Sequence, residues 1–431
     1  MNKFLLLILI VSNNLFAGYG EFFGPGSTSA ARGNQGSLLG REANTNFHTP
    51  ALISKNDSLT LEVNSMATLF NFNPIENVIN QNSTNSTTTT TGNADTDYSE
   101  LLMSSIHLIV PIKDLEGAIG VSLFSPMFYV AEFNSGHSYM PEYVMYRSRL
   151  SRLQAHINYS QPINDEWSFS VGTQIGFGVD TELTANASLN GTNYPSSSEA
   201  RAKVFPKLGA IISVAKINEK SAYAFTYLQE LKSTVEATVL GETSDLRIIF
   251  DLKSNALLYY DPHTFRLSSE HDFDFLKLHL EAEYQLWKNY ETPRINLIQM
   301  GSVLSSQNFE KMDLRNIFLL KAGTTLSLSD QLAVNAGVSY RQSPLQGDFS
   351  GSGNSLDTDY LSIHLGGSLT TTIFSKEIKL SAGLQHHLLK EIQVTKTAGQ
   401  ENGNNGLKIG APGYTIGGST TSISLGAGVE F

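Results

Sequence analysis

The chain of 431 residues has no cysteine, few charged residues and, after its first residues, no long apolar run. Without cysteine it has neither a disulfide framework nor a thiolate zinc site, and no cysteine can carry a lipid anchor. No later stretch approaches the ~20 apolar residues of a membrane-spanning helix, which argues against a helical membrane protein. The formal net charge of -11 argues against a nucleic-acid surface, and a charged fraction of 16% is low for a soluble surface.

The first residues have the three parts of a secretory signal peptide. Lys3 supplies a positive charge, the residues from Phe4 to Val11 form an unbroken apolar core, and Ala17 is a small residue suited to cleavage. The core is much shorter than the ~20 residues that cross a bilayer, so an anchor is disfavoured. We therefore expect residues 1–17 to direct export and to be removed.

From about residue 58 the dominant pattern is alternation of apolar and polar residues, which is typical of β-strands with two different faces. In one such stretch, apolar residues from Leu276 to Leu286 alternate with Lys277, His279, Glu281, Glu283 and Gln285. Four consecutive ionisable residues on one face require water beside them. This pattern fits the outer face of a soluble sandwich or the lumen of a membrane barrel. Because the chain shows no linker and no internal repeat, a single large architecture is favoured.

The connections between the predicted strands favour the barrel. Short turns alternate with long polar loops, such as residues 73–97 and 398–413, and a soluble sandwich has no reason to sort its loops in this way. Some strands exceed the ~9 to 11 residues that cross a membrane, so we expect them to project beyond the outer rim. The fourteen predicted strands lie at roughly residues 58–72, 99–111, 116–131, 149–160, 166–182, 202–215, 221–236, 254–269, 274–288, 314–327, 331–342, 357–373, 376–390 and 418–431.

The last strand ends in an aromatic residue, Phe431. Such an end is similar to the signal that the outer-membrane assembly machinery recognises. Closure of a barrel also requires this strand to pair with the first one, because pairing removes both edges.

Four segments, in order, resemble the FadL-type family of outer-membrane long-chain fatty-acid and hydrocarbon transporters. Residues 27–53 are similar to the N-terminal plug of that family, with Thr49 in place of an Asn before the matching Pro50 and Ala51. The other segments are residues 117–133 with 163–174, residues 261–290 with Tyr284 and Trp287, and residues 320–367 with a Ser-Pro step after a Tyr-Arg strand end.

The resemblance implies an all-β fold, a 14-stranded antiparallel transmembrane β-barrel plugged by an N-terminal hatch. Residues 18–54 would form the hatch and residues 55–431 the barrel with its long extracellular loops, in the outer membrane of a Gram-negative cell. The ligand would be captured in the outer loops, pass to a lumen site beside the hatch, and leave sideways through a gap made by a kink in an early strand. Pro126 lies in the third strand and cannot donate to a ladder, so we expect a break there.

The aromatic residues of the hatch are the first candidates for ligand contact. Tyr19, Phe22 and Phe23 would lie near the mature N-terminus, where they either touch the ligand or pack the plug against the barrel wall. Pro50 and Ala51 either take part in gating with Thr49 or form a rigid turn before the first strand.

Basic residues are the candidates for binding a carboxylate head group. Arg315 lies where the resemblance places a basic residue of the fatty-acid transporters, and its alternative is an Arg at the solvent end of a strand. Arg147, Arg149 and Arg152 form a second cluster, which we expect to contact lipopolysaccharide phosphates at the rim.

No set of residues indicates catalysis. His386 and His387 are adjacent, so on a strand they point to opposite faces and cannot share one metal. We predict a protein that is not an enzyme, has no cofactor or metal, and, from the resemblance, is a monomer. Its ligand would be a long-chain fatty acid or, as an alternative, an aromatic or alkane hydrocarbon. An outer-membrane lipid hydrolase and a receptor-like barrel remain alternatives of other classes.

Overall fold

The computed structural model describes residues 20–81, 89–94, 98, 101–127, 141–146, 151–187, 197–243, 248–291, 296–300, 312–346, 355–373, 376–395 and 413–431. The predicted signal peptide, residues 1–17, lies outside this set. Among the described residues, no helix is both long and apolar enough to span a membrane.

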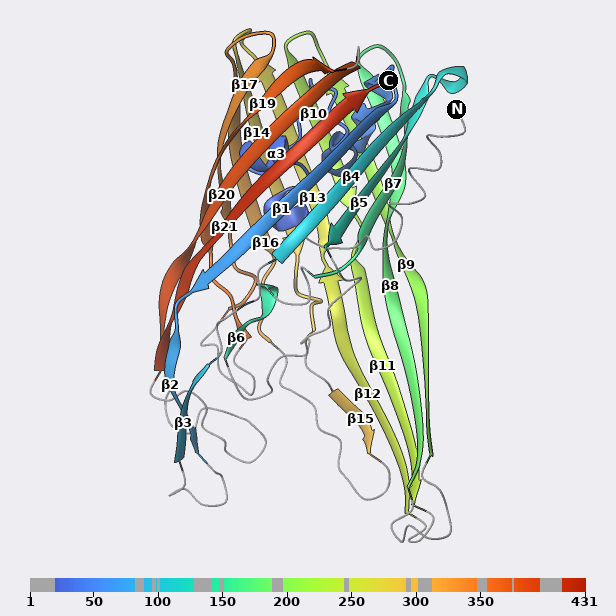
Figure 1. The fold of residues 1–431 in the computed structure, drawn as a ribbon, viewed down its shortest axis with the longest axis vertical. Coiled ribbons are helices and arrows are strands. Elements are labelled where there is room, and N and C mark those ends of the chain that lie inside the picture. The colour runs from blue at the N-terminus through green and yellow to red at the C-terminus, as the bar shows by residue number, and fades with distance from the viewer. Residues whose placement is uncertain are drawn as a thin grey trace.

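The described chain begins with short helices that lie inside a barrel (Figure 1). They are α2 (Gly20–Phe23), α3 (Ser27–Ala31), α4 (Thr45–His48) and the 3-10 helix η1 (Pro50–Lys55). Gly24 and Gly33 follow the first two helices with φ of 89° and 81°, a left-handed conformation that favours glycine and turns the chain back. The plug is therefore a string of tight turns rather than a separate domain with its own core.

Within the described residues, fourteen strands form a closed antiparallel ring. The ring closes where β1 pairs with β21, in register from Thr60 with Glu430 to Phe72 with Gly418. The strands are β1 (Thr60–Phe72), β4 (Leu101–Ile112), β5 (Gly117–Pro126), β7 (Gln154–Pro162), β8 (Trp167–Ala187), β9 (Ser197–Ile217), β10 (Ser221–Leu228), β13 (His263–Asp272), β14 (Leu276–Leu286), β16 (Ile317–Ser327), β17 (Leu332–Arg341), β19 (Tyr360–Ile373), β20 (Lys376–Thr395) and β21 (Gly413–Glu430). The predicted fold class is confirmed.

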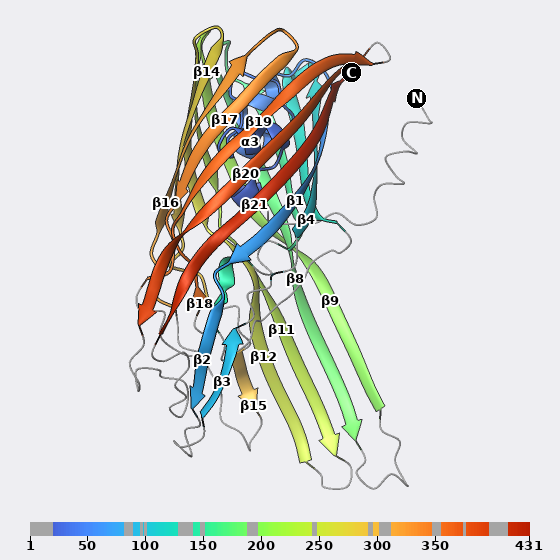
Figure 2. The ribbon, with the colours of Figure 1, turned by 60° about the vertical axis from the view of Figure 1, so that its left-hand side comes forward.

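The ring carries short turns at one end and extensions at the other (Figures 1 and 2). A short 3-10 helix, η2 (Lys113–Leu115), forms the turn between β4 and β5. The elements beyond the ring strands are β2 (Ile75–Gln81), β3 (Thr89–Ala94), β6 (Glu142–Tyr143), η3 (Val144–Tyr146), β11 (Leu231–Thr243), β12 (Ile248–Asp261), β15 (Asn296–Met300) and β18 (Ser355–Leu356). Since short turns face the periplasm in such barrels, the extensions mark the outer side.

Two of the predicted strands are wrong in their extent. Residues 221–236 and 254–269 were each expected to form one strand, but the chain leaves the ring after Leu228 and returns at His263. The β11–β12 hairpin between these points pairs in parallel with the outer half of β8, from Val179 to Ala187. β7 pairs with β8 only up to Ile175, so β11 covers an edge that would otherwise be open.

β8 and β9 are 21 residues each and continue with β11 and β12 well beyond the ring (Figure 2). The expectation that some strands project past the outer rim is therefore confirmed. At the same side of the barrel, β5 ends at Pro126, which pairs with Met103 on one neighbour, while the ladder to β7 ends at Phe124. Pro126 thus terminates the strand, and no kink within a continuous strand is seen at this residue.

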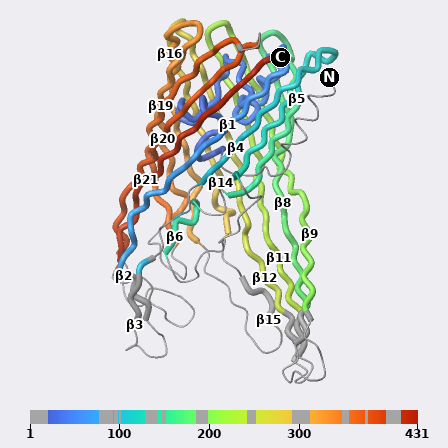
Figure 3. Tube along the Cα trace, viewed as in Figure 1, coloured from blue at the N-terminus to red at the C-terminus, as the bar shows by residue number. Residues whose placement is uncertain are grey.

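The two faces of the ring strands differ as the alternation predicts, but water does not fill the inner side. Large apolar side chains such as Leu267, Leu425 and Ile363 are exposed on the outer face. His279, Glu281, Glu283 and Gln285 are at most 5% exposed, because the hatch fills the lumen beside them (Figure 3). The prediction that this row requires water was wrong, since the hatch backbone and buried cations take its place.

Candidate functional site

The lumen wall holds the hatch by binding its backbone. Arg266 of β13 donates through Nη1 to the carbonyl oxygen of His48 at 2.9 Å, at the end of α4. His364 of β19 donates from Nδ1 to the carbonyl oxygen of Ala30 at 2.8 Å, because a carbonyl can only accept. The last carbonyl groups of a helix have no partner within the helix, so these side chains satisfy them.

One carboxylate ties two parts of the hatch to the wall. Glu42 accepts from Arg32 of the hatch and, at 2.7 Å, from Lys379 of β20. Burial by itself would raise the pKa of the Glu42 carboxyl, but the Arg32 guanidinium and the Lys379 ammonium lower it well below its ordinary value. The carboxylate is therefore ionised at neutral pH. We refer to the ion pairs of Glu42 with Arg32 and Lys379 as the clasp.

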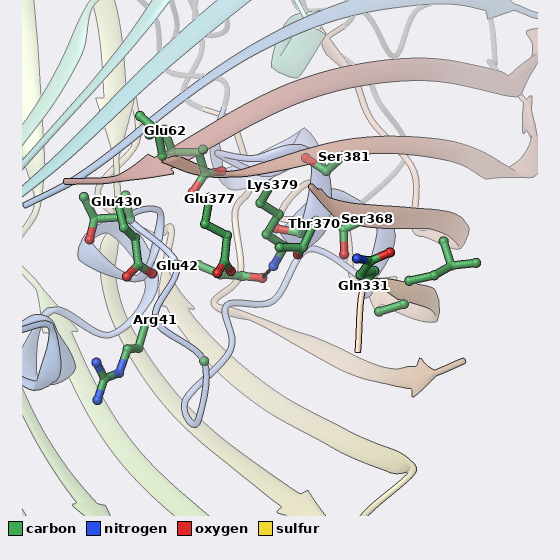
Figure 4. Close-up of a pocket in the computed structure, with 18 of the residues that line it drawn as sticks. Arg41, Glu42, Glu62, Gln331, Ser368, Thr370, Glu377, Lys379, Ser381 and Glu430 are labelled. Carbon is green, nitrogen blue, oxygen red and sulfur yellow. Dashed lines mark hydrogen bonds and ion pairs between the residues drawn. The ribbon is translucent and has the colours of Figure 1, made fainter. Parts of the chain in front are cut away.

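A polar pocket of about 320 Å³ opens beside this clasp, at the end of the barrel that carries the short turns (Figure 4). All the labelled side chains around it are charged or polar. They include Arg41, Glu42, Glu62, Glu377, Lys379 and Glu430. Such a lining suits water and ions rather than an apolar molecule.

The opposite end of the hatch enters an aromatic cluster. The ring centre of Phe22 lies 5.7 Å from that of Tyr146 and 6.4 Å from that of Tyr360. Phe23 stacks on His387 at 5.2 Å, and His387 in turn stacks on Tyr360 at 4.8 Å. The cluster also contains Met66, Phe72, Met103, Phe124, Tyr143, Met145, Tyr260, Trp287, Tyr290, Leu314 and Leu345. It is a buried, mostly apolar surface at the tip of the hatch, which suits a hydrophobic ligand.

An ion pair is built into this cluster. Nη1 of Arg341, at the end of β17, donates to Oδ2 of Asp357 at 3.1 Å, and both side chains are at most 2% exposed. The guanidinium carbon of Arg341 lies 5.0 Å from the ring centre of Phe22 and 5.9 Å from that of Trp287. Burial raises the pKa of Asp357, although Arg341 opposes this effect.

The structure brings some of the predicted site residues together and separates others. Phe22 and Phe23 both belong to the aromatic cluster, while Tyr19 lies outside the described residues. Arg315 does not contact Phe22 or Phe23 in the structure. It donates to the carbonyl oxygen of Ser343 and to Asp359, and its side chain is 40% exposed. The cation beside Phe22 is Arg341 instead.

Thr49 lies between α4 and η1, and Pro50 and Ala51 are the first two residues of η1. Pro50 is the first residue of η1, so a 3-10 helix separates it from β1, which begins at Thr60. The carbonyl oxygen of Ala51 accepts from Ser160 of β7 at 2.7 Å. Oγ1 of Thr49 is buried and has no hydrogen-bond partner among the described residues. This step is thus packed against the wall near the end of the hatch.

The expected lipopolysaccharide contact of Arg152 is wrong. Arg152 is 1% exposed and forms an ion pair with Asp261. Its guanidinium carbon stacks on the ring of Tyr259, 3.8 Å from the ring centre. Arg152 joins β7 to the β11–β12 hairpin, which the sequence pattern did not predict. Arg147 and Arg149 lie outside the described residues.

Sequence reasoning missed Arg341, Asp357 and Tyr360. A signal was present, because the Tyr-Arg strand end and the Asp-rich return after it belong to the fourth segment of the family resemblance. Its residues were not assigned to the lumen. Among the described residues, no group of His, Asp and Glu has an arrangement that could hold a metal ion.

Comparison with known proteins agrees with the fold. Residues 26–422 match the model of a family described as outer membrane protein transport protein (OMPP1/FadL/TodX). A Pseudomonas aeruginosa FadL homologue superposes with a TM-score of 0.67 at 16% identity, covering 97% of this chain and all of the other. The P. putida toluene transporter TodX superposes with a TM-score of 0.57 at 12% identity, covering 95% of this chain and 99% of that one.

A curated relative is similar over a shorter stretch. Alkane uptake protein A of Marinobacter nauticus is 28% identical over 141 residues. The match spans 32% of this chain and 30% of that protein.

Proposed function

Because the chain belongs to the family of outer membrane transport proteins described as OMPP1/FadL/TodX, we propose that it takes up hydrophobic small molecules passively across the outer membrane. The observation that carries the proposal is the aromatic cluster at the tip of the hatch, in which Phe22 contacts Tyr146 and Tyr360. A buried aromatic surface reached from the outer side can exchange hatch side chains for an apolar ligand at little cost in solvation.

The path we propose begins in the outer loops and passes to the cluster. Arg315, which is 40% exposed, would meet the ligand before it enters. Movement of the hatch about Thr49, Pro50 and Ala51 would then open the way.

The ligand would leave sideways near Pro126, where the ladder between β5 and β7 has ended. The charged lining of the pocket at the short-turn end supports this exit, because an apolar molecule gains nothing by crossing Glu42, Lys379 and Glu377.

For the ligand, we propose long-chain fatty acids, with hydrocarbons as the alternative. The superposition on a FadL homologue supports the barrel and hatch needed for either. The similarity to a protein named for alkane uptake supports the hydrocarbon alternative. The protein would act as a monomer in contact with membrane lipids and lipopolysaccharide.

The test is uptake of radiolabelled oleate and hexadecane by cells that lack their own transporters. We expect the wild type to take up at least one of the two, and the double variant F22A/F23A or deletion of residues 18–30 to change the rate sharply. The matched control is F275A, because Phe275 is 66% exposed on a turn and the change removes an aromatic side chain outside the cluster. Surface binding without uptake would instead favour a receptor, and free passage of polar solutes would favour a general porin.

A further inference from the structure

Several polar atoms of the aromatic cluster are buried without a hydrogen-bond partner among the described residues. They include Nη2 of Arg341, Oδ1 of Asp357 and Oη of Tyr146, and also Nδ1 of His387 beside Phe23. A polar atom that is left without a partner in an apolar setting lowers the stability of the fold. Because buried polar groups are normally satisfied, these atoms indicate that a polar group from outside the chain completes the cluster.

The atoms of Arg341, Asp357 and Tyr146 that lack a hydrogen-bond partner lie near the ring of Phe22 in the hatch. The guanidinium carbon of Arg341 is 5.0 Å from the ring centre of Phe22, and the ring centre of Tyr146 is 5.7 Å from it on another element. Asp357 is held through Oδ2 by Nη1 of Arg341 at 3.1 Å and by Oγ of Ser343 at 2.9 Å. The backbone N–H of Thr358 also approaches the carboxylate, but Oδ1 has no hydrogen-bond partner among the described residues. Whatever completes these atoms therefore lies next to the tip of the hatch.

The chemistry of the ion pair discriminates between polar groups. A guanidinium only donates and a carboxylate only accepts, whereas a hydroxyl group does both and carries no charge. A hydroxyl can thus satisfy the pair without disturbing its charge balance. An ionised carboxylate would place a second negative charge beside the buried Asp357, and a plain hydrocarbon would leave the atoms open.

We propose that Arg341 and Asp357 select apolar molecules that end in a hydroxyl group, such as long-chain alcohols, over carboxylates of the same chain length. The proposal rests on the uptake function proposed above, and at this site it ranks alcohols above the fatty acids named there as the default ligand. Asp357 is the residue that sets the preference, because it compensates the positive charge that would otherwise attract an anionic head group. Tyr146 supplies a further hydroxyl at the same place.

The two tryptophans of the chain provide the measurement. Trp287 is fully buried in the cluster, 5.9 Å from the guanidinium carbon of Arg341, whereas Trp167 is 40% exposed on the outer face of β8. In the W167F background, Trp287 alone reports quenching by chain-brominated dodecanol or dodecanoate. The protein is reconstituted in lipid nanodiscs at pH 9, where the acid is ionised, and affinities are expressed per mole fraction of ligand in the bilayer.

We expect the alcohol to bind at least about tenfold more tightly than the carboxylate, because a like charge is avoided. D357N should abolish or reverse this preference, since it leaves Arg341 uncompensated. D359N is the matched control two residues away: its carboxylate shares Ser343 with Asp357, accepting from the Ser343 N–H at 2.7 Å, but its cationic partner is Arg315 at 3.4 Å, so the preference should persist.

Equal or tighter binding of the carboxylate to the parent protein would overturn the proposal, as would the same change in D357N and D359N. Quenching by neither ligand would instead contradict the uptake function itself. If D357N does not fold, the binding of brominated dodecane and of a brominated dodecyl methyl ether to the parent protein is compared with the binding of the brominated alcohol. The alcohol must bind more tightly than both, and equal binding would mean that water alone fills the open positions.

Discussion

Lys379 of β20 lies 2.7 Å from Oε1 of Glu42 in the hatch, and the same carboxylate also accepts from Arg32. The pair spans 337 positions of sequence and joins the plug to the wall. Arg32 and Glu42 are buried, at 4% and 8% exposure of their side chains, so each charge depends on the other for compensation.

Replacing Glu42 by Gln should loosen the hatch. The change removes the hydrogen-bonded carboxylate partner of the buried Arg32 guanidinium, which costs about 3 kcal/mol. We expect faster hydrogen exchange in residues 27–48 and more frequent openings in planar-bilayer conductance. E377Q is the control, because Glu377 is exposed at the same pocket (Figure 4). Similar behaviour of the two variants would show that the clasp does not hold the hatch.

Acid should loosen the hatch in the wild type. The pKa of Glu42 is held well below its ordinary value of 4.5, so its contribution to stability is present above pH 4.5 and is lost as the pH falls through the folded pKa. Burial also lowers the pKa of His48 well below 6.5, so the folded hatch disfavours its protonation and stability falls below pH 6.5. Both effects act in one direction.

Conductance recorded between pH 7 and pH 3 measures this effect. Openings should increase below about pH 6.5 and again below about pH 4.5. In E42Q the second increase should be smaller, because Glu270, which accepts from the hatch backbone at Leu39, remains. A conductance that is constant over this range, or that decreases with acid, would refute the assignment.

Gly120 of β5 should tolerate no side chain, because α4 approaches it closely. A Cβ there would lie 2.1 Å from Oδ1 of Asn46 and 2.8 Å from Cδ1 of Ile53. We expect G120A to destabilise the hatch by about 1–3 kcal/mol through overpacking. The control is G428A, where a Cβ meets its nearest atom, the carbonyl oxygen of Leu61, at 3.8 Å. Hydrogen exchange of residues 42–55 compares the two, and equal protection would contradict the predicted contact.

Much of the barrel could be predicted because each ring strand carries its own two-faced pattern. Leu425 and Ile423 alternate with Ser424 and Ser422, and in the structure the former are exposed and the latter buried. The pairing of the last strand with the first follows from closure alone. Local sequence thus determines which residues face the membrane.

The sequence could not show where strands change partners. Residues 221–236 were expected to form one strand, but the chain leaves the ring at Gln229 because β8 offers an unpaired edge that only the closed barrel creates. Arg341 joins the site for a similar reason. Its neighbours Phe22, Tyr146 and Tyr360 come from α2, η3 and β19, and only folding brings them together. The sequence showed that the hatch carries aromatic residues, but it did not show which residues of the barrel they contact.

Removing Phe431 should affect assembly more than stability. Its ring is 45% exposed and lies 5.5 Å from Nζ of Lys376, and its backbone N–H donates to the carbonyl oxygen of Leu59 at 2.9 Å. Removing it leaves the β1–β21 ladder, which ends at Glu430, in place. If the residue is read by the outer-membrane assembly machinery, the variant should give less folded barrel in cells, measured by heat-dependent gel mobility. Refolding of the purified protein into liposomes is the control and should be unchanged. A defect in liposomes equal to that in cells would point to a structural role.

Thr49 offers a test of the hatch turn that does not depend on any ligand. Its Oγ1 is buried without a hydrogen-bond partner among the described residues, so T49V removes an unsatisfied hydroxyl while keeping the shape of the side chain. We expect the unfolding free energy of the hatch to rise by about 1 kcal/mol. Thr68 is the matched buried threonine, and its Oγ1 lies 2.7 Å from Oγ of Ser422. T68V should therefore lower the stability by about 1 kcal/mol. Denaturant titrations of both variants would contradict this account if T49V were the more damaging change.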